Sequence, residues 1–486
     1  MQTLWNDRFT LPEYPRLTGT LYTDVAVVGG GIAGILTAYM LRERGVRVVL
    51  LEEDRLASGA TAHTTAKISA QHGLFCTRLI ENFGLHLARQ YMRTNLHAVT
   101  QYRKLIEEKH IDCGFSTENS YLYRTHDTPS LAQELESARA LGAPVKSVVV
   151  KDIPFSAEEA LCFEEQAQFS PLPFLAALLP GLTVYEHSGV RSIRGHLLRC
   201  DGGSVHAEHI VVATHFPMLE PYGLYALRLH QQRSYILALE NAPSFSGMWL
   251  DAGADGWSFR RSGKYLLMGG GGHRCGENLG DSYEKLRSEA HRLFPQAQEV
   301  YAWSTQDCVS LDGVPYIGSY SSVTPYLHVA TGFGKWGMTG AMVAATLLSA
   351  QIVGSHYPYA DIFSPMRFFP TASIETLMEG AGYAVRGISR RLSRRAETLT
   401  QHIAPGHGGI VRWQGKKYGV YRHTDGVLFA VDIRCPHLGC ELQWNDDEKT
   451  WDCPCHGSRF GYDGHRLGNP ARAALRPCKD FGRREI

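Results

Sequence analysis

The 486-residue chain lacks several features that mark common functional classes. Its formal net charge is only +1, which gives no reason to expect nucleic acid or an acidic partner. No apolar run is long enough to cross a bilayer, and the start, MQTLWNDRFTLPEYPRL, lacks the charged-then-apolar pattern of a signal peptide. Internal repeats and low-complexity tracts are also absent. The sequence therefore predicts a cytoplasmic globular protein of two or three domains.

Cysteine is sparse over most of the chain but concentrated at one place. Seven of the 11 cysteines stand singly, which is typical of buried free thiols in a cytosolic protein. The other four lie within residues 434–461, RCPHLGCELQWNDDEKTWDCPCHGSRFG, where they form a C-x-H pair (Cys435, His437) and a C-x-x-H pair (Cys453, His456). Two cysteines and two histidines hold either tetrahedral zinc or a Rieske [2Fe–2S] cluster, in which the cysteines bind one iron and the histidines the other.

The residues around these pairs favour the cluster. Each pair carries a further cysteine, Cys440 or Cys455, that a four-ligand site does not need. The segment resembles the Rieske family, whose loops read C-x-H-x-G-C and C-P-C-H-G-S. Gly468-Asn469-Pro470 resembles the third loop, which covers the cluster. The resemblance implies a disulfide, Cys440–Cys455, between the loops, and it implies as ligands Cys435, His437, Cys453 and His456.

One position departs from the high-potential Rieske proteins. These often have a tyrosine two residues after the serine, where it donates a hydrogen bond to a ligand sulfur. Here Ser458 is present, but the tyrosine is replaced by Phe460. Hydrogen bonds to sulfur raise the cluster potential. We therefore expect a potential within the Rieske range of about −150 to +300 mV but below its top.

Residues 24–53, DVAVVGGGIAGILTAYMLRERGVRVVLLEE, carry a dinucleotide-binding fingerprint. They predict a buried strand, a glycine turn G-x-G-x-x-G (Gly29, Gly31, Gly34), a helix, and a second strand that ends at Glu52. The glycines allow a pyrophosphate to approach a helix N-terminus, and Glu52 can accept hydrogen bonds from the adenosine ribose. A glycine-rich turn without a ligand is the alternative. No second such motif follows a strand, so we do not expect direct use of NADH.

Three later segments predict that the dinucleotide is FAD. HIVVATH (209–215) is a strand that ends where a sheet closes near a flavin, and LDGVPYIG (311–318) precedes the strand YLHVATG. GFGKWGMTGAMVAATLLSAQIVG then begins with glycines and becomes a helix, whose N-terminus can stabilise negative charge on the flavin. This order resembles the D-amino-acid oxidase type of FAD-dependent oxidoreductase over about residues 20–355. The expected cofactor-binding residues are Gly29, Gly31, Ile32, Ala33, Gly34, Glu52, Glu53, His63, Thr64, Thr65, Ala213, Thr214, Asp312, Gly332, Gly334, Gly337, Met338 and Thr339.

His63 lies in GATAHTTA, which resembles a segment of dimethylglycine dehydrogenases where a histidine bonds covalently to FAD. The alternative is a histidine near the flavin without a covalent bond. In the resembled family, a sheet from the middle of the chain covers the flavin and lines the substrate pocket. Candidate catalytic and pocket residues are Tyr235, Tyr265, Lys335 and Trp336, with Trp257 as a further lining residue. For each aromatic residue the alternative is core packing. No catalytic base is singled out, because hydride transfer to a flavin is chemistry of the cofactor.

The predicted fold is an α/β FAD-binding Rossmann-like domain with an α+β substrate domain, followed by an all-β Rieske domain. The FAD-dependent part spans residues 1–355, with FAD-binding elements at about 20–75, 185–220 and 305–355 and substrate elements at about 76–184 and 221–304. A linker with a helix spans 356–402, and the Rieske domain spans 403–486. Residues 408–435 alternate like three antiparallel strands. The linker helix carries Arg386, Arg390, Arg391, Arg394 and Arg395, which suit either contact with a membrane surface or acidic carrier, or packing on the protein with the arginines in water.

The two cofactors together predict an electron path. A substrate carbon gives up two electrons as a hydride, a Rieske cluster carries one electron at a time, and a flavin converts between the two. The combination resembles bacterial fusions of D-amino-acid-oxidase-type flavoproteins with a C-terminal Rieske domain, and TTAKISAQHG (64–73) strengthens the match. We therefore predict a dehydrogenase of an amino acid or amine that uses an external one-electron acceptor, a protein or a quinone. The cluster histidines lie at an exposed tip in the resembled proteins, which suits such exchange. The alternative is an electron-transfer component of an oxygenase-like or reductive system, with the flow reversed or shared.

Overall fold

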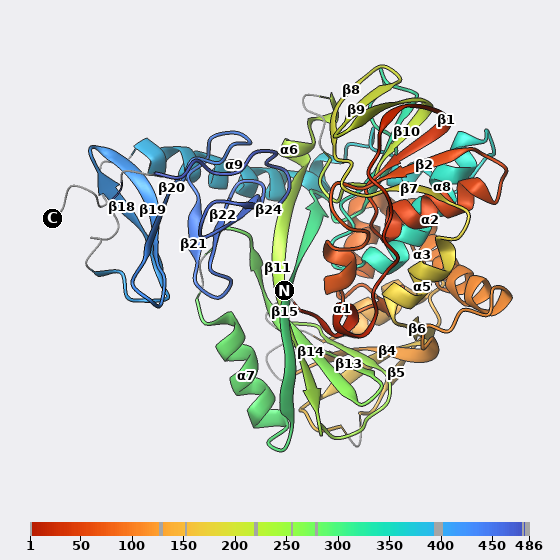
Figure 1. Ribbon diagram of the computed structural model, residues 1–486. Helices are drawn as coiled ribbons and strands as arrows, with labels where there is room; N and C mark the ends of the chain where they lie inside the picture. Colours follow the sequence, from red (N-terminus) through yellow and green to blue (C-terminus); the bar gives the residue numbers. More distant parts are fainter. Residues whose placement is uncertain are drawn as a thin grey trace.

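The computed structural model describes residues 2–125, 130–150, 153–217, 222–253, 256–277, 280–392, 402–478 and 481 (Figure 1). Two large sheets and their helices form the first three quarters of the chain, and two small sheets form its C-terminal part. The helices are α1 (Leu4–Arg8), α2 (Ile32–Arg42), α3 (Cys76–Glu108), α4 (Ala132–Ala140), α5 (Pro171–Leu178), α6 (Tyr225–Arg228), α7 (Ser282–Leu293), α8 (Gly337–Ile352) and α9 (Pro370–Leu392), with the 3₁₀ turns η1 (Ala60–His63), η2 (Tyr222–Leu224) and η3 (Asp361–Phe363).

The first sheet has the strand order β16-β17-β10-β1-β2-β7, with the hairpin β8–β9 paired to β10. β1 runs parallel to both β10 and β2, so the carboxyl ends of these strands meet at one edge. Buried Val, Ile and Leu side chains make both faces apolar, as a sheet covered on both sides requires. Its strands are β1 (Gly19–Val28), β2 (Val48–Leu51), β7 (Thr183–Tyr185), β8 (Val190–Arg194), β9 (Leu197–Cys200), β10 (Gly203–Val212), β16 (Tyr316–Ser319) and β17 (Leu327–Thr331).

The second sheet has the order β15-β11-β14-β13-β12-β4-β6-β3, with β5 paired to β6. Its long strands β11 and β15 are antiparallel neighbours: Leu229 is opposite Ser310 at one end, and Glu240 is opposite Gln298 at the other. They lie between the first sheet and the C-terminal part (Figure 1). The strands are β3 (Lys67–Ile68), β4 (Ser116–Arg124), β5 (Val145–Val148), β6 (Glu159–Gln168), β11 (Leu229–Glu240), β12 (Met248–Asp251), β13 (Ser258–Ser262), β14 (Tyr265–Arg274) and β15 (Gln298–Ser310).

The C-terminal part is built from two small antiparallel sheets. The three strands predicted between residues 408 and 435 are confirmed as β18 (Gly408–Trp413), β19 (Lys416–Arg422) and β20 (Leu428–Asp432). The second of these sheets consists of β21 (Gln443–Asn445), β22 (Thr450–Asp452), β23 (Arg459–Gly461) and β24 (Arg466–Gly468). The two cysteine loops join β20 to β21 and β22 to β23, so both lie at one end of this part. The predicted α/β, α+β and all-β classes are thereby confirmed.

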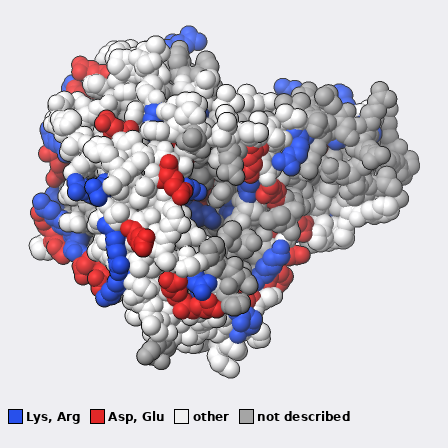
Figure 2. Space-filling model, turned by 180° about the vertical axis from the view of Figure 1, so that it is seen from behind, with Lys and Arg blue, Asp and Glu red and all other residues white. Residues whose placement is uncertain are grey.

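The linker helix is α9, and Arg394 and Arg395 lie outside the described residues. The apolar side chains of Ile374, Met378 and Val385 on this helix are 57%, 70% and 65% exposed, so they do not pack on the protein. Basic and acidic side chains are interspersed over the face seen in Figure 2. Within the described parts of the chain, no helix combines the length and apolar character needed to cross a membrane.

A buried ion pair fixes the segment after β15. Both oxygens of Asp312 accept hydrogen bonds of 2.8 Å from Arg367, and the two side chains are 2% and 3% exposed. We predict that Asp312→Ala lowers the free energy of unfolding by about 3–5 kcal/mol, because the buried guanidinium of Arg367 loses its counter-charge. Urea unfolding followed by flavin fluorescence measures this change. The matched control is Glu289→Ala, whose partner Arg292 is 67% exposed and whose loss costs less than about 1 kcal/mol. Equal losses in the two variants contradict the prediction.

Candidate functional site

A cavity of about 1220 Å³ opens at the carboxyl edge of the first sheet. It is lined by the turn after β1, the end of β2, the residues after β10, the start of α8, and strands β11, β14 and β15 of the second sheet. Part of its wall comes from the C-terminal part of the chain, at Glu448, Thr450, Arg459, residues 466–470 and residue 472. The volume is of the size that a large cofactor and a small substrate need.

The glycine turn has the geometry that a pyrophosphate site requires. Gly29 has φ 109°, and a Cβ atom there would lie 2.4 Å from the carbonyl oxygen of Ala213. Gly31 is the N-cap of α2 and lines the cavity. Gly34 does not line it; a Cβ atom there would lie 1.9 Å from the Gly29 carbonyl oxygen, so this glycine lets α2 pack against the turn.

Glu52 lies at the end of β2 in the orientation expected for a ribose-binding acid. Its carboxylate accepts hydrogen bonds from the backbone N–H of Gly30 (2.6 Å) and of Asp54 (2.9 Å). Burial raises the pKa of Glu52, although the hydrogen bonds from these backbone donors act to lower it. The carboxylate is thus fixed beside the glycine turn.

Most of the other predicted FAD-binding residues meet at the cavity. The ring of Trp336 stacks on His72 at 4.5 Å between centroids, just before α8 begins at Gly337. The ring Nδ1 of His63 donates to the Gly59 carbonyl at 2.8 Å, which leaves Nε2 as the nitrogen that can meet a ligand. The predicted residues that line the cavity are Gly29, Gly31, Ile32, Ala33, Glu52, Glu53, His63, Thr64, Thr65, Ala213, Thr214, Tyr235, Gly332, Gly334, Lys335, Trp336, Gly337 and Met338.

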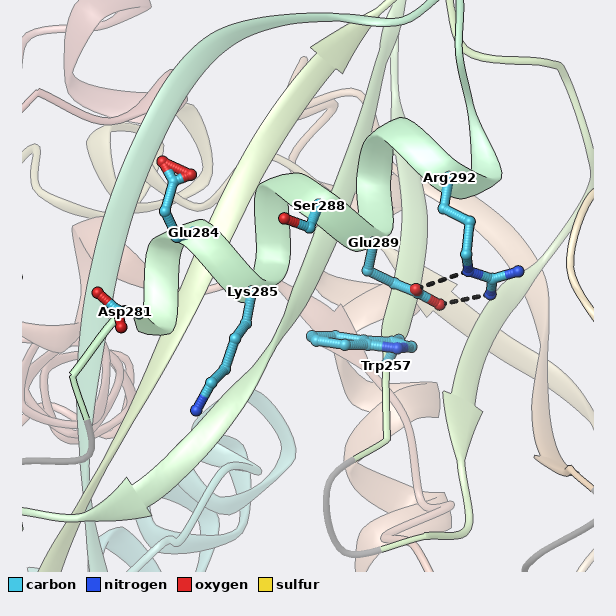
Figure 3. A pocket seen from close by; sticks show the side chains of 7 residues that line it. All are labelled: Trp257, Asp281, Glu284, Lys285, Ser288, Glu289 and Arg292. Carbon is cyan, nitrogen blue, oxygen red and sulfur yellow. Dashed lines mark hydrogen bonds and ion pairs between the residues drawn. The ribbon is translucent and has the colours of Figure 1, made fainter.

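The structure places two predicted pocket aromatics elsewhere. Tyr265 is 3% exposed and packs against Tyr301, and its hydroxyl accepts a 3.0 Å hydrogen bond from Arg8. Trp257 lines a separate hollow on the surface of α7, beside Glu289 and Arg292 (Figure 3). Tyr265 thus packs in the core, and Trp257 is half-buried, with one side against a hydrophobic cluster and the other in this hollow.

Two predicted cofactor-binding residues also have other partners. Asp312 is paired with Arg367, as described above. Thr339 lies in the first turn of α8, where its buried hydroxyl donates to the carbonyl of Ser69 at 3.3 Å. Neither residue lines the cavity.

Several cavity residues were not predicted from the sequence. Asp307 on β15 lines the cavity; burial raises its pKa to about 7, and the positive charge of Lys335 acts in the opposite direction. Lys67 donates to Ser258 Oγ at 2.6 Å and to the Trp249 carbonyl at 2.8 Å, and burial lowers its pKa to about 7. His215 and Phe216, directly after the predicted Ala213-Thr214, line it too. No sequence motif singles out Asp307, and its place in the cavity follows from its position on β15.

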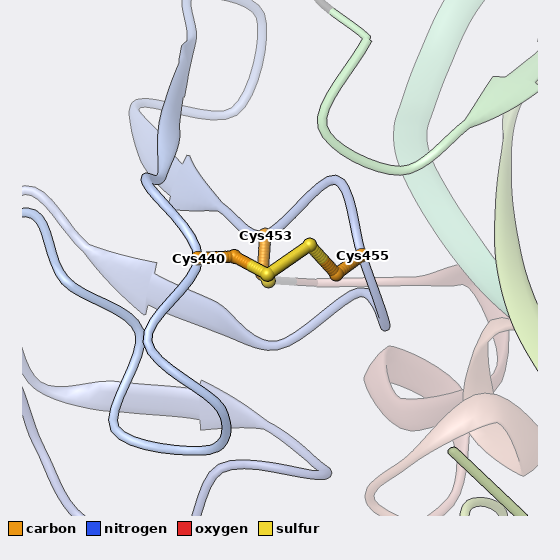
Figure 4. A group of neighbouring side chains, drawn as sticks. All are labelled: Cys440, Cys453 and Cys455. Carbon is orange, nitrogen blue, oxygen red and sulfur yellow. A yellow bond between two sulfur atoms is a disulfide. The ribbon is translucent and has the colours of Figure 1, made fainter. Parts of the chain in front are cut away.

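The C-terminal loops bring the predicted cluster ligands together. Cys435 and Cys453 are buried free thiols that hydrogen-bond to each other, and the rings of His437 and His456 lie 4.9 Å apart between centroids. Cys440 and Cys455 form a disulfide next to Cys453 (Figure 4). Only Cys453 of these three therefore keeps a thiol for a metal.

The donor atoms of this site fit a Rieske cluster. The Nδ1 atoms of His437 and His456 are buried and have no hydrogen-bond partner, as expected of atoms that face a metal. The His456 ring also hydrogen-bonds to the backbone of Ala226, which is how a metal-binding histidine is oriented. Ser458 Oγ accepts from the N–H of Ala471 and hydrogen-bonds to the thiol of Cys435, whereas Phe460 is fully buried in the core. One sulfur-directed donor is thus present.

The histidine tip is covered instead of exposed. His456 is 8% exposed and lies against Phe216, whose ring centroid is 6.3 Å from that of His456 and 6.3 Å from that of His437. Since Phe216 also lines the cavity, one side chain separates the two candidate cofactor sites. Unlike the exposed tip of the resembled proteins, this site has a buried His456 and a half-buried His437, with Leu438, next to His437, 59% exposed.

Comparison with known proteins agrees with both sites. The family model described as FAD dependent oxidoreductase matches residues 24–351. The chain belongs to this family. Its C-terminal part, residues 398–479, matches the Rieske [2Fe-2S] domain, so FAD and a [2Fe-2S] cluster are its cofactors.

Three relatives show the extent of the similarity. The putative Rieske 2Fe-2S iron-sulfur protein YhfW of Bacillus subtilis is 36% identical over 99% of this chain and 97% of its own length. The glycine oxidase of Geobacillus kaustophilus is 27% identical, over 66% of this chain and 92% of its own. A crystal structure of glycine oxidase from that organism superposes with a TM-score of 0.61 at 22% identity, over 72% of this chain and 99% of its own.

Replacing one predicted ligand tests the cluster assignment. We predict that Cys453→Ser lowers bound iron at least about tenfold and removes the reduced-Rieske EPR signal, because an alcohol at this position is a poor iron ligand. Iron and acid-labile sulfide analysis with low-temperature EPR measures the effect. Cys113→Ser, a buried free cysteine in the first part of the chain, is the matched control and should keep both. One zinc per chain with no sulfide would show that the site is a zinc site.

Proposed function

We propose that the protein oxidises an amino acid or amine at the FAD site and passes single electrons through the Rieske cluster to an external acceptor. FAD supplies hydride acceptance, and the cluster supplies one-electron transfer. The position of Phe216, which lines the cavity and touches both histidine rings, is the observation that carries the proposal. A glycine oxidase among the relatives supports a donor with a CH–NH group.

The side chains of the cavity have distinct tasks in this proposal. Tyr235 and Trp336 both line the cavity, whose volume leaves room for a small substrate beside the cofactor. The Lys335 ammonium lies close to Ser234 and Gly272, where it can attract a substrate carboxylate. Asp307 faces the same cavity and can take a proton from a substrate ammonium, which must be neutral before it can lose a hydride.

Electrons are proposed to leave on the His437 side. His437 is half-buried while His456 is buried against α6, so the His437 edge is the more accessible of the two. The exposed side chain of Leu438 gives this edge an apolar contact for a protein or quinone acceptor. The exposed apolar residues of α9 are consistent with an acceptor at a membrane surface.

Anaerobic mixing with candidate donors tests the function. We expect a pool of amino acids and methylated amines to bleach the flavin absorbance and to produce the reduced-Rieske EPR signal without another reductant. A signal that appears only with dithionite would contradict electron entry from such donors at the flavin. It would then favour an electron-transfer component with the flow reversed or shared.

The state of Asp307 sets an expected pH dependence. Burial raises the pKa of Asp307 to about 7, so the carboxyl is protonated below that pH and can accept a proton only above it. We predict that the rate of flavin reduction by donor rises as pH passes through about 7 and that Asp307→Asn lowers it about 10²-fold or more and removes this rise. Stopped-flow absorbance between pH 5.5 and 8.5 measures both. The control Glu299→Gln, a partly exposed acid on the same strand that is paired with Arg287, should keep the wild-type profile.

A further inference from the structure

The C-terminal Rieske part contributes a wall to the FAD cavity at its adenosine end. Arg466, Asn469 and Arg472 line the same cavity as Glu52 and Glu53, the acids that follow β2. These arginines belong to the segment from β24 onward, 413 residues or more beyond Glu53 in the chain. Residues of both cofactor domains therefore meet over the part of the site where the dinucleotide fingerprint places the ribose.

Glu53 is held from both sides by charged hydrogen bonds. Its Oε1 accepts from Arg191 Nη1 at 2.9 Å and from Arg466 Nη2 at 2.6 Å. Arg466 is in turn fixed through Nη1, which donates to Asn469 Oδ1 at 2.9 Å, and its side chain is 23% exposed. Charge-assisted hydrogen bonds of this kind hold both partners in place.

A second contact joins the same segment to the first sheet. Arg472 Nη2 donates to the carbonyl of Val190, at the start of β8, with a distance of 2.8 Å. Arg191, Arg466 and Arg472 thus bring three guanidinium groups to one end of the cavity, against the carboxylates of Glu53 and Asp201. These guanidinium groups suit the diphosphate and adenosine of FAD, because guanidinium groups bind phosphate oxygens and stack on planar rings.

We propose that the Rieske segment 466–472 is part of the FAD-binding site, with Arg466 positioning Glu53 and closing the adenosine end. FAD is then bound by both domains, and its binding and the docking of the Rieske domain strengthen each other by the same factor. Bound flavin therefore strengthens the docked position of the cluster, which the buried contacts between the two parts already favour. The inference rests on FAD binding alone and is independent of which donor the enzyme oxidises.

Release of FAD on dilution tests the proposal. Arg466→Leu is compared with the wild-type residue in a His63→Ala background, so that no covalent bond to the flavin can hide dissociation. The fluorescence of released FAD should give a Kd about 10- to 100-fold higher for Arg466→Leu, as expected for the loss of one charged hydrogen bond. Arg412→Leu, on the exposed surface of β18 in the same domain, is the matched control and should leave the Kd unchanged. A Kd within twofold of the parent, with the Rieske EPR signal intact, would overturn the proposal.

Hydrogen exchange provides a measurement that needs no variant at the arginine. In the His63→Ala background, amide exchange is compared between FAD-loaded protein and protein depleted of FAD by dialysis, both with the cluster retained. Backbone amides of residues 466–472 should exchange at least about tenfold more slowly when FAD is bound, because the segment is held against the cofactor. Equal exchange in the two samples would also overturn the proposal, even if Arg466→Leu failed to fold.

Discussion

The buried ion pair between Arg233 and Asp452 fixes the position of the two cofactor domains relative to each other. Arg233 lies on β11 and Asp452 at the end of β22, their charged atoms are 3.3 Å apart, and the side chains are 0% and 2% exposed. A shift that kept these charges buried but separated them would cost several kcal/mol. Because Asp452 directly precedes Cys453, the pair fixes the cluster loop relative to the second sheet. The C-terminal part is thus docked in one position and does not lie loosely at the end of its linker.

Contacts around this pair explain how close the two sites come. Gln231 donates to the carbonyls of His456 (2.7 Å) and Asn469 (3.1 Å), and Gln306 donates to that of Gly457 at 2.8 Å. A Cβ atom on Gly457 would lie 2.7 Å from the Cβ of Gln231, so only glycine allows this approach. Gln231 and Gln306 also line the FAD cavity. The same side chains therefore form a wall of the flavin site and a support of the cluster loop.

The sequence predicts the parts of both sites that depend on local spacing. The glycine turn with Glu52, and the paired Cys and His loops, are short segments whose chemistry follows from residue type and distance along the chain. Arg233, Asp307 and Phe216 are different, because their roles arise from the pairing of β11 with β15 and from the docking of two domains. Tyr265 was wrongly placed for a related reason: it begins β14 on the core side, while Gly269 and Gly270 of the same strand line the cavity. A strand pattern alone does not show which part of a strand meets a ligand.

The central claim is that electrons pass from flavin to cluster within one docked chain. Its most direct test is the rate of cluster reduction after a light pulse reduces the flavin in the presence of EDTA, followed by rapid-freeze EPR at several protein concentrations. The account predicts a first-order rate that is independent of concentration. A rate that rises in proportion to protein concentration would show transfer between molecules and would contradict the account.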